Sequence, residues 1–443
     1  MSLKRKLIEG SSWILFSRAA GAVVGLAFTS LLARTLPPEQ MGTYFIALSA
    51  AMLFSTVVDF GLPRTATRLL AEATTNRFDT NASGIAVRSL ALLLLIGTVL
   101  GTVYHLLLGD WLADHLFHSA DMSAISGYIA IWLVLLALRT FAAESFRGLG
   151  DIRLASLFNG LFGNSITLIL LGIAVILPIH MDIANTIGFV LAGLGISAAT
   201  ALVLLFRQTA RFTGNEHVSL STILAISTPI MLAGSLQVAL MQSNIWILGA
   251  VADHVEVALY GAVKQIALLI SIPFIIVNNA IPQLVVKLNA EGHHEKMENL
   301  LRTVATITFI PALIIVIGLA LFARPLLVLV YGQTYGAGAP ALLLLALGEL
   351  ANVIAGPCGI TLLMTGHQKA NMIVTLGTGF VAIPLSIYLS IHYGAAGAAA
   401  SAAVALALQN GVSAVLVRKY AGVSSHISFS RRILGQFRLR NFL

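Results

Sequence analysis

Residues 86–108 read AVRSLALLLLIGTVLGTVYHLLL, and runs of this kind decide the fold. A helix needs roughly 20 mostly apolar residues to cross a bilayer. About twelve such runs follow one another, at residues 12–35, 41–60, 86–108, 125–146, 154–178, 183–206, 222–250, 257–281, 301–323, 338–363, 370–391 and 394–417. They are too long and uniform for the alternating strands of a membrane barrel. The sequence therefore predicts an all-α integral membrane protein with twelve transmembrane helices.

Composition supports this prediction. Hydrophobic residues make up 58% of the 443-residue chain and charged residues 10%. A soluble domain carries about 25% charged residues, and this chain has too little polar surface to cover a globule in water. A lone cysteine, Cys358, excludes a disulfide framework and a thiol-pair metal site. The first apolar run has no small-residue cleavage site, so we interpret it as the first span rather than a signal peptide.

The net charge of +8 is distributed unevenly between the joints. Basic residues gather in alternate joints and the tail, as at Lys6, Arg68, Arg153, Arg211, Lys287, Lys369 and Arg418. The intervening joints carry Asp110, Asp114, Asp121, Asp182, Asp253 and Glu256. This positive-inside pattern places both termini in the cytoplasm and requires an even number of spans. It argues against nucleic acid as a partner, and contact with anionic lipid headgroups is expected for the tail.

An internal repeat divides the chain. Three pairs of segments match in the same order: 32–44 with 248–260, 59–63 with 278–282, and 150–153 with 366–369. We therefore predict two six-helix bundles, 1–210 and 211–420, followed by a basic cytoplasmic tail, 421–443. An even number of spans per half gives both bundles the same orientation, which makes the repeat parallel. Short amphipathic segments at 64–72 and 283–291 are expected to lie in the membrane interface as helices.

Several motifs resemble those of one transporter superfamily. They are Leu32-Ala-Arg34 with Pro38-Glu39, Gly42-x-Tyr44, Asp59-x-Gly61-Leu62-Pro63 with Arg68, and Gly150-x-x-Arg153. Together they resemble the multidrug/oligosaccharidyl-lipid/polysaccharide exporter superfamily, and within it most closely the flippases of undecaprenyl-diphosphate-linked O-antigen or capsule units. That family usually has a Leu-Gly-Pro-Glu run at this point. The chain departs from it and has Leu36-Pro37-Pro38-Glu39, without the glycine.

The resemblance implies two pseudo-symmetric bundles around a central cavity that opens alternately to each side. It implies a multi-pass protein of the bacterial inner membrane. We expect no enzymatic activity and no cofactor, because the sequence has no visible catalytic set. The expected partners are an undecaprenyl-diphosphate glycan and membrane lipids, with a polysaccharide polymerase and a chain-length regulator as candidate protein partners.

Three cations in apolar runs are candidate substrate-binding residues, because ionisable groups deep in a bilayer are costly. Arg18, Arg139 and Lys264 suit the phosphates of an anionic headgroup. Other interpretations stay open: Arg18 can snorkel to headgroups, and Arg139 or Lys264 can pair with an acid for structural reasons.

Polar side chains on two further faces extend the predicted site. Lys264 shares a helix face with Asn278, and Gln237 shares one with Asn244 in span seven. Thr228-Pro229 in span seven is a candidate hinge, because proline removes a backbone hydrogen bond. No metal is expected: nothing at metal-ligand spacing accompanies His293-His294.

Glu349, near the middle of span ten, is the candidate coupling-ion residue. Burial disfavours a charged carboxyl, so we expect a proton or cation to bind there unless a basic residue pairs with it. Residues near the cytoplasmic ends of spans are assigned to a gating rim: Asp59, Arg64, Arg68, Arg147, Arg153 and Lys369.

The prediction for function is a flippase that moves lipid-linked oligosaccharide to the outer leaflet by alternating access. A cation-coupled multidrug antiporter is the alternative within transport, although that branch usually relies on acids in each half. A membrane-embedded glycan polymerase or a scaffold is the alternative from another class. The chain has no Walker A run, zinc signature or nucleophile elbow.

Overall fold

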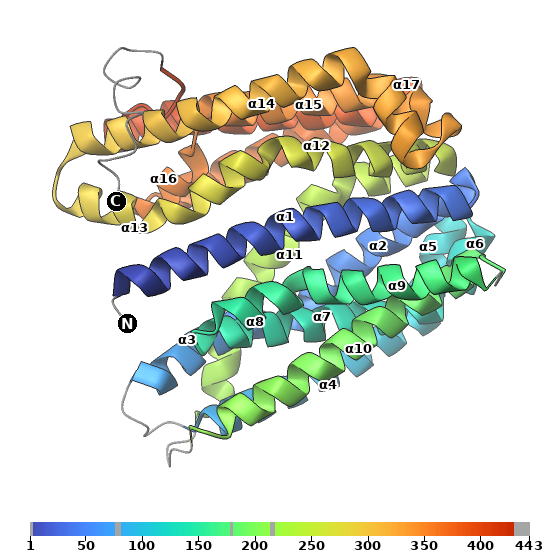
Figure 1. Ribbon diagram of the computed structural model, residues 1–443, viewed down its shortest axis with the longest axis horizontal. Helices are drawn as coiled ribbons and strands as arrows, with labels where there is room; N and C mark the ends of the chain where they lie inside the picture. The colour runs from blue at the N-terminus through green and yellow to red at the C-terminus, as the bar shows by residue number, and fades with distance from the viewer. Residues whose placement is uncertain (1–2, 76–80, 178–179, 213–217, 429–443) are drawn as a thin grey trace. The chain divides into compact units, whose positions relative to one another are not determined.

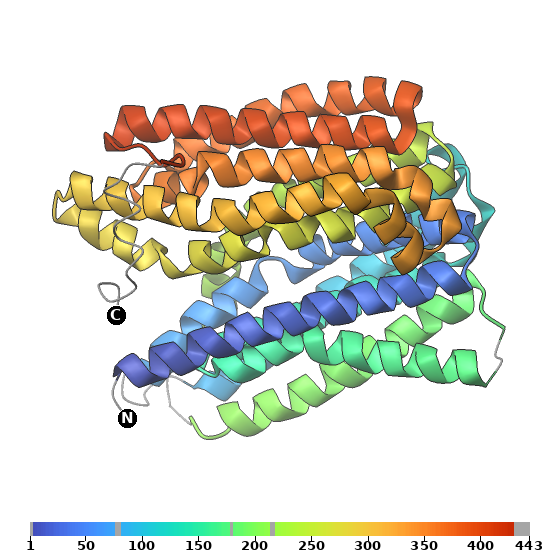
Figure 2. The ribbon, with the colours of Figure 1, turned by 45° about the horizontal axis from the view of Figure 1, so that its top comes forward.

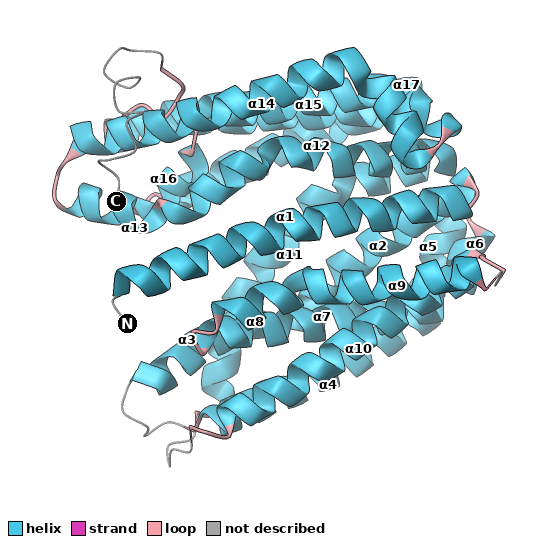
Figure 3. Cartoon of the chain, viewed as in Figure 1, coloured by secondary structure: helices cyan, strands magenta, loops and turns pink. Residues whose placement is uncertain are grey.

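A computed structural model describes residues 3–75, 81–177, 180–212 and 218–428. These residues form helices and short connections without any strand (Figure 3). Ten helical runs within the described residues are long and apolar enough to cross a membrane. One of them, α17 (Gln368–Ala421), leaves helical geometry at Gly394 and so holds two spans. Helix α1 (Leu3–Thr35), whose described apolar part is shorter, completes the predicted twelve.

The chain divides into two compact units, Met1–Ala250 and Val251–Leu443. The first contains, after α1, the helices α2 (Pro38–Asp59), α3 (Leu62–Thr75), α4 (Ala82–Val103), α5 (Gly109–His115), α6 (Ala120–Ala124), α7 (Ser126–Gly148), α8 (Ile152–Ser156), α9 (Phe162–Ile176), α10 (Ile183–Thr209) and α11 (Leu220–Val251) (Figure 1). π-helical turns at Tyr104–Leu108 and Leu157–Leu161 continue α4 into α5 and α8 into α9.

The second unit contains α12 (His254–Ala280), α13 (Pro282–Ala290), α14 (His294–Tyr331), α15 (Ala339–Ala355), α16 (Cys358–Met364) and α17. A 3-10 turn at Gln333–Gly338 precedes α15. The short helices α3 and α13 coincide with the two predicted amphipathic segments.

Helix α11 packs on the first unit at both of its ends. Near its start, Ser227 Oγ lies 2.8 Å from Thr65 Oγ1, and both side chains are buried. Near its end, Gln242 Nε2 lies 3.0 Å from Met52 Sδ, which it contacts as a donor. The boundary between the compact units accordingly falls between residues 250 and 251 of the sequence, whereas the predicted boundary between the halves falls between 210 and 211.

A close approach at Gly61 fixes where α2 ends. Phe60 and Gly61 both have positive φ, at 47° and 69°, so the chain turns sharply before α3. A Cβ at Gly61 would collide with the main-chain oxygen of Ser227. Only glycine combines this backbone conformation with this contact. The turn sets the end of α2, and with it the position of Asp59.

Helix α17 reverses at Gly394, where φ is 55° (Figure 2). Its two halves lie side by side, since Ser401 Oγ donates to the Ala382 oxygen at 3.0 Å. At the reversal, Glu256 Oε2 accepts a hydrogen bond from the Ala395 amide at 2.6 Å. The first residues of α12 therefore cap the second half of α17.

Candidate functional site

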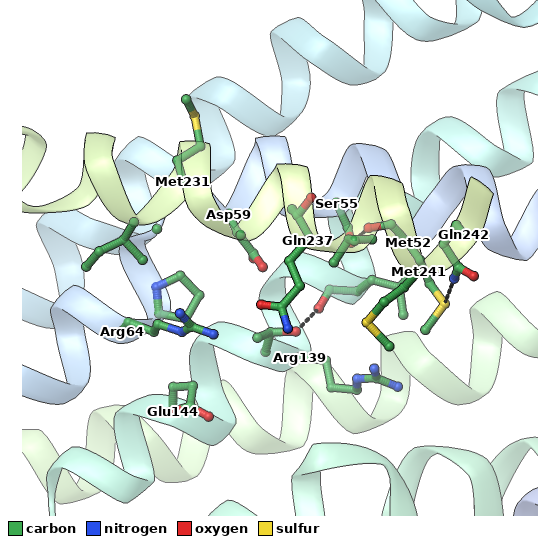
Figure 4. Close-up of a pocket in the computed structure, with 18 residues that line it drawn as sticks. Met52, Ser55, Asp59, Arg64, Arg139, Glu144, Met231, Gln237, Met241 and Gln242 are labelled. Atoms are coloured by element: carbon green, nitrogen blue, oxygen red, sulfur yellow. Dashed lines mark hydrogen bonds between the residues drawn. The ribbon is translucent and has the colours of Figure 1, made fainter. Parts of the chain in front are cut away.

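A cavity of about 360 Å³ lies inside the first unit, between α2, α3, α7 and α11. Its polar lining consists of Ser55, Thr56, Asp59, Arg64, Arg139, Thr140, Glu144, Gln237 and Gln242. Its apolar lining includes Met52, Met231 and Met241 (Figure 4). Charged groups in the interior of a membrane protein mark functional sites by default, so this cavity is the candidate site.

Asp59 and Arg139 are two of the charged residues that line the cavity. Asp59 is the last residue of α2, and Arg139 lies near the middle of α7. The charges of Arg139 and Arg64 both act on the Asp59 carboxylate. Yet Asp59 Oδ1 and Arg139 Nε are each buried without a hydrogen-bond partner among the described residues. Buried polar atoms are almost always paired, so an acceptor and a donor are left available here for a ligand or water.

Glu144 is already engaged by its neighbours. It forms an ion pair with Arg147 at 2.5 Å, one turn along α7. Thr67 Oγ1, on α3, lies 2.8 Å from the Glu144 main-chain oxygen and 3.2 Å from its carboxylate. These contacts join α3 to α7 and offset the negative charge of Glu144. Asp59 is thus the lining acid that opposes Arg64 and Arg139.

Helix α11 supplies the remaining wall. Gly234, Val238 and Met241 lie at helical spacings of four and three, so they present one face to the cavity. The exposed Gln237 amide reaches the space near Asp59 and Arg139 (Figure 4). Pro229 lies within α11, between the Ser227 contact and this wall. Helix α11 is therefore fixed by contacts at Ser227 and Gln242, and the Gln237 amide, which can donate and accept hydrogen bonds, lies between them.

The second unit holds a separate polar cluster. Ser271 on α12 donates a hydrogen bond to Glu349 Oε2 on α15, and Asn352 Nδ2 lies 3.5 Å from the same oxygen. Asn278 Oδ1 is buried without a hydrogen-bond partner among the described residues. Lys264 lies on α12 seven residues before Ser271, a spacing that places it on the same helix face. Glu349 is therefore held by a hydroxyl donor on α12 and an amide donor on α15.

The structure brings together part of the predicted site. Arg139, Gln237, Asp59 and Arg64 line one cavity. Lys264, Asn278 and Glu349 lie in the second unit, and Asn244 lies on α11 outside the cavity lining. The Arg18 side chain lies outside the described part of the structure.

The other residues predicted at the rim lie elsewhere. Arg68 pairs with Glu72 at 2.9 Å, and Lys369 is exposed at the start of α17. The carbonyl of Arg153 accepts a hydrogen bond from Trp13 Nε1 at 3.2 Å. Asp59, assigned to the rim because it lies at the end of span two, lines the cavity together with Arg139.

Sequence reasoning missed Gln242 and the three methionines of the lining. Gln242 stands five residues after Gln237 within an apolar run, so polarity alone was an available signal. The methionines carry no such signal, because an apolar side chain in an apolar helix does not reveal which face it occupies.

Comparison with known proteins now identifies the family. Residues 7–282 match the model of the polysaccharide biosynthesis protein family. The chain belongs to that family. Residues 229–388 also match the MatE family model, which overlaps the first match at α11 and α12. No curated protein matches the chain closely enough to count as a relative.

Solved structures share the fold over nearly the whole chain. An inward-facing multidrug resistance MATE family transporter of the MOP superfamily has a TM-score of 0.75 at 17% identity, covering 95% of this chain and 96% of that one. A MOP superfamily transporter from Pyrococcus furiosus has a TM-score of 0.66 at 16% identity, covering 94% and 95%. The lipid II flippase MurJ in an inward closed conformation has a TM-score of 0.64 at 15% identity, covering 93% and 87%.

These likenesses confirm the predicted fold, an all-α membrane protein with twelve helices in two bundles. They also confirm the resemblance drawn from the motifs around Leu32, Asp59 and Gly150. The chain thus belongs to the polysaccharide biosynthesis protein family and shares its multi-pass helical fold with solved transporters of the MOP superfamily.

Proposed function

We propose that this member of the polysaccharide biosynthesis family is a lipid-linked oligosaccharide flippase. It moves undecaprenyl-diphosphate-linked units from the cytoplasmic to the outer leaflet by alternating access, for surface polysaccharide biosynthesis. We place it in the bacterial inner membrane with both termini in the cytoplasm. A polysaccharide polymerase and a chain-length regulator would then act on its product.

The observation that carries this proposal is the buried Nε atom of Arg139, which has no hydrogen-bond partner among the described residues. A guanidinium matches the geometry of phosphate oxygens and stays charged in proteins. Moving a diphosphate into low dielectric is costly unless cations accompany it. Arg139, supported by Arg64, supplies that compensation at the cavity wall.

The balance of charge favours an anionic cargo over a cationic drug. Two arginines, Arg64 and Arg139, line the cavity together with two acids, Asp59 and Glu144. Arg147, which lies outside the lining, pairs with Glu144, so Asp59 is the lining acid without an ion pair among the described residues. A multidrug antiporter would instead need carboxylates free to bind cations. The carboxylate that fits that need, Glu349, lies in the second unit among Ser271 and Asn352, and we assign it to coupling.

Energetics permit transport without ATP. Moving one charge across 100 mV is worth about 2.3 kcal/mol, and an inside-negative potential favours outward movement of a dianion. Cationic groups that move with the cargo would cancel this gain, and a proton or sodium ion at Glu349 would restore it. Insensitivity of flipping both to an imposed potential and to ion gradients would contradict this account.

The decisive experiment measures flipping in proteoliposomes that contain the purified full chain and undecaprenyl-diphosphate oligosaccharide. We expect flipping by the wild type and at least about a tenfold loss for Arg139→Gln, which corresponds to about 1.4 kcal/mol. Arg211→Gln, which removes an exposed arginine far along the chain, is the matched control and should flip normally.

A double variant separates substrate binding from simple charge pairing. If Arg139 serves only to neutralise Asp59, Asp59→Asn combined with Arg139→Gln should restore flipping. If Arg139 binds phosphate, the double variant should stay as slow as Arg139→Gln. Dye efflux without flipping would favour the antiporter, and activity in cells without flipping by the purified chain would favour a scaffold.

A further inference from the structure

The tenth span is broken between α15 and α16, at a point that the last described residues of the chain contact. Helix α15 ends at Ala355, and α16 begins at Cys358. Between them, Gly356 has φ 77° and ψ −167°, and Pro357 has no amide hydrogen to donate. The break therefore interrupts the helical hydrogen bonds and leaves backbone carbonyls in need of other donors.

Those donors come from a short segment that follows α17. Helix α17 ends at Ala421 and is followed by Gly422, which has φ 68°, and residues 423–428 then continue without regular secondary structure. We call residues 423–428 the latch. The Ile427 amide donates to the Ile354 oxygen at 3.0 Å, and Ser425 Oγ donates to the Ala355 oxygen at 3.0 Å. The latch thus replaces, at the break, bonds that a continuous helix would make.

The latch also holds the α16 side of the break. Ser425 Oγ lies 3.1 Å from Cys358 Sγ, and both groups are buried. Val423, 1% exposed, packs in an apolar cluster with Cys358 and Leu362 of α16. A Cβ at Gly356 would collide with the main-chain oxygen of Ser425. The latch therefore fits tightly over both sides of the break.

Helix α14 provides a third anchor. The Ser424 amide donates to Glu298 Oε2 at 3.2 Å. The Ser428 amide and carbonyl each lie 3.2 Å from Thr306 Oγ1. The latch is consequently tied to α14, α15 and α16 by a few individual hydrogen bonds rather than by a helix or sheet.

We propose that the latch is a releasable clamp across a hinge at Gly356 and Pro357, and that it opens during each transport cycle. When closed, it prevents α15 and α16 from bending against each other. When open, it frees the one point in this span where the backbone already lacks helical bonds. Glu349 lies on α15 two turns before the break, so bending there would change the surroundings of the coupling residue. The role in transport rests on the proposed flippase function.

The first test uses Cys358, the only cysteine of the chain, as a reporter that the closed latch covers. We expect N-ethylmaleimide to label Cys358 slowly in the full-length protein in proteoliposomes. Ile427→Pro removes the amide that binds Ile354, so labelling should accelerate at least about tenfold. Ile427→Val keeps that amide and should label like the wild type. Equal rates for the proline and valine variants would overturn the clamp.

The second test locks the latch. Ser425→Cys places a second thiol beside Cys358, and oxidation should join the two, as checked by mass spectrometry. If the latch must open, the oxidised protein should lose at least about tenfold in flipping, and dithiothreitol should restore it. Full flipping by the oxidised, verified disulfide form would overturn the proposal.

The two tests also separate the latch from the proposed function. Latch-dependent labelling of Cys358 supports the clamp even if no variant flips the lipid-linked oligosaccharide, and that result would count against the flippase assignment alone. Flipping by the reduced Ser425→Cys protein, together with its loss on oxidation, supports both.

Discussion

Gly61 leaves no room for a side chain at the contact between the α2–α3 turn and α11. Its φ of 69° is unfavourable for other residues, and a Cβ would meet the Ser227 oxygen. The same contact places Asp59, two residues earlier, at the cavity. A small backbone change at this residue should therefore be felt in stability and at the site.

We expect Gly61→Ala to destabilise the protein by at least about 1–3 kcal/mol, the usual cost of a residue held in an unfavourable backbone conformation. Thermal unfolding in detergent would measure this. Gly234→Ala on α11 is the matched control, because no other atom lies within 4 Å of the added Cβ and φ is ordinary. Similar unfolding temperatures for the two variants would contradict the argument.

Glu349 gives a prediction about coupling at the same scale. Glutamine keeps an oxygen that accepts hydrogen bonds from Ser271 and Asn352 but has no charge or titratable proton. We expect Glu349→Gln to fold normally and to flip without dependence on a proton or sodium gradient. Flipping assays with imposed gradients would check this, with the exposed Glu295→Gln as the control. A gradient dependence that survives Glu349→Gln would remove the coupling role.

Individual site residues were predictable where polarity conflicts with an apolar run. Arg139 and Gln237 were identified in this way, and both line the cavity. Asp59 on α2 and Arg139 on α7 line the same cavity although 80 positions of sequence separate them, and no local pattern encodes this arrangement. The pairing of Glu144 with Arg147, by contrast, follows from their helical spacing.

Helix boundaries are the features that the sequence predicted best. The apolar runs at 41–60 and 183–206 correspond closely to α2 and α10, because length and hydropathy suffice to define a span. The break in the tenth span at Gly356 was not predicted. It depends on the latch residues Ser425 and Ile427, which lie far along the chain.

The reversal of α17 shows the same dependence on a distant partner. The sequence predicted two spans that meet near Gly394, but not the Glu256 carboxylate that caps the second one. We expect Glu256→Ala to lower stability by about 1.5–3 kcal/mol, as for hydrogen bonds to charged groups. Glu256→Gln keeps an acceptor and should lose less in the same thermal unfolding measurement. Equal losses for alanine and glutamine would argue against the cap.

At the scale of the whole molecule, the distribution of basic residues predicts orientation. Asp121 lies in a joint assigned to the outer side, and Lys369 lies in one assigned to the cytoplasm. In a Cys358→Ser background, an impermeant maleimide should label Asp121→Cys in intact spheroplasts. Lys369→Cys should be labelled only after permeabilisation. The reverse pattern would invert the proposed topology and the direction of transport.

The repeat within the sequence predicted two halves, and two compact units are present. The unit boundary falls after α11 because Ser227 and Gln242 bind side chains of the first unit. Hydropathy marks where a helix crosses the membrane, but it does not determine which other helices that helix packs against. Helix packing depends on close local contacts, such as the one between Gly61 and the Ser227 main-chain oxygen.

The methionines that line the cavity have a consequence for cargo diversity. Met52, Met231 and Met241 are unbranched and polarizable, so their side chains reshape easily around different partners. For the proposed cargo, a flexible wall of this kind would accommodate different saccharides attached to the same diphosphate. We expect that a bacterium with such a carrier can diversify its surface coat through its glycosyltransferases while the carrier itself stays unchanged.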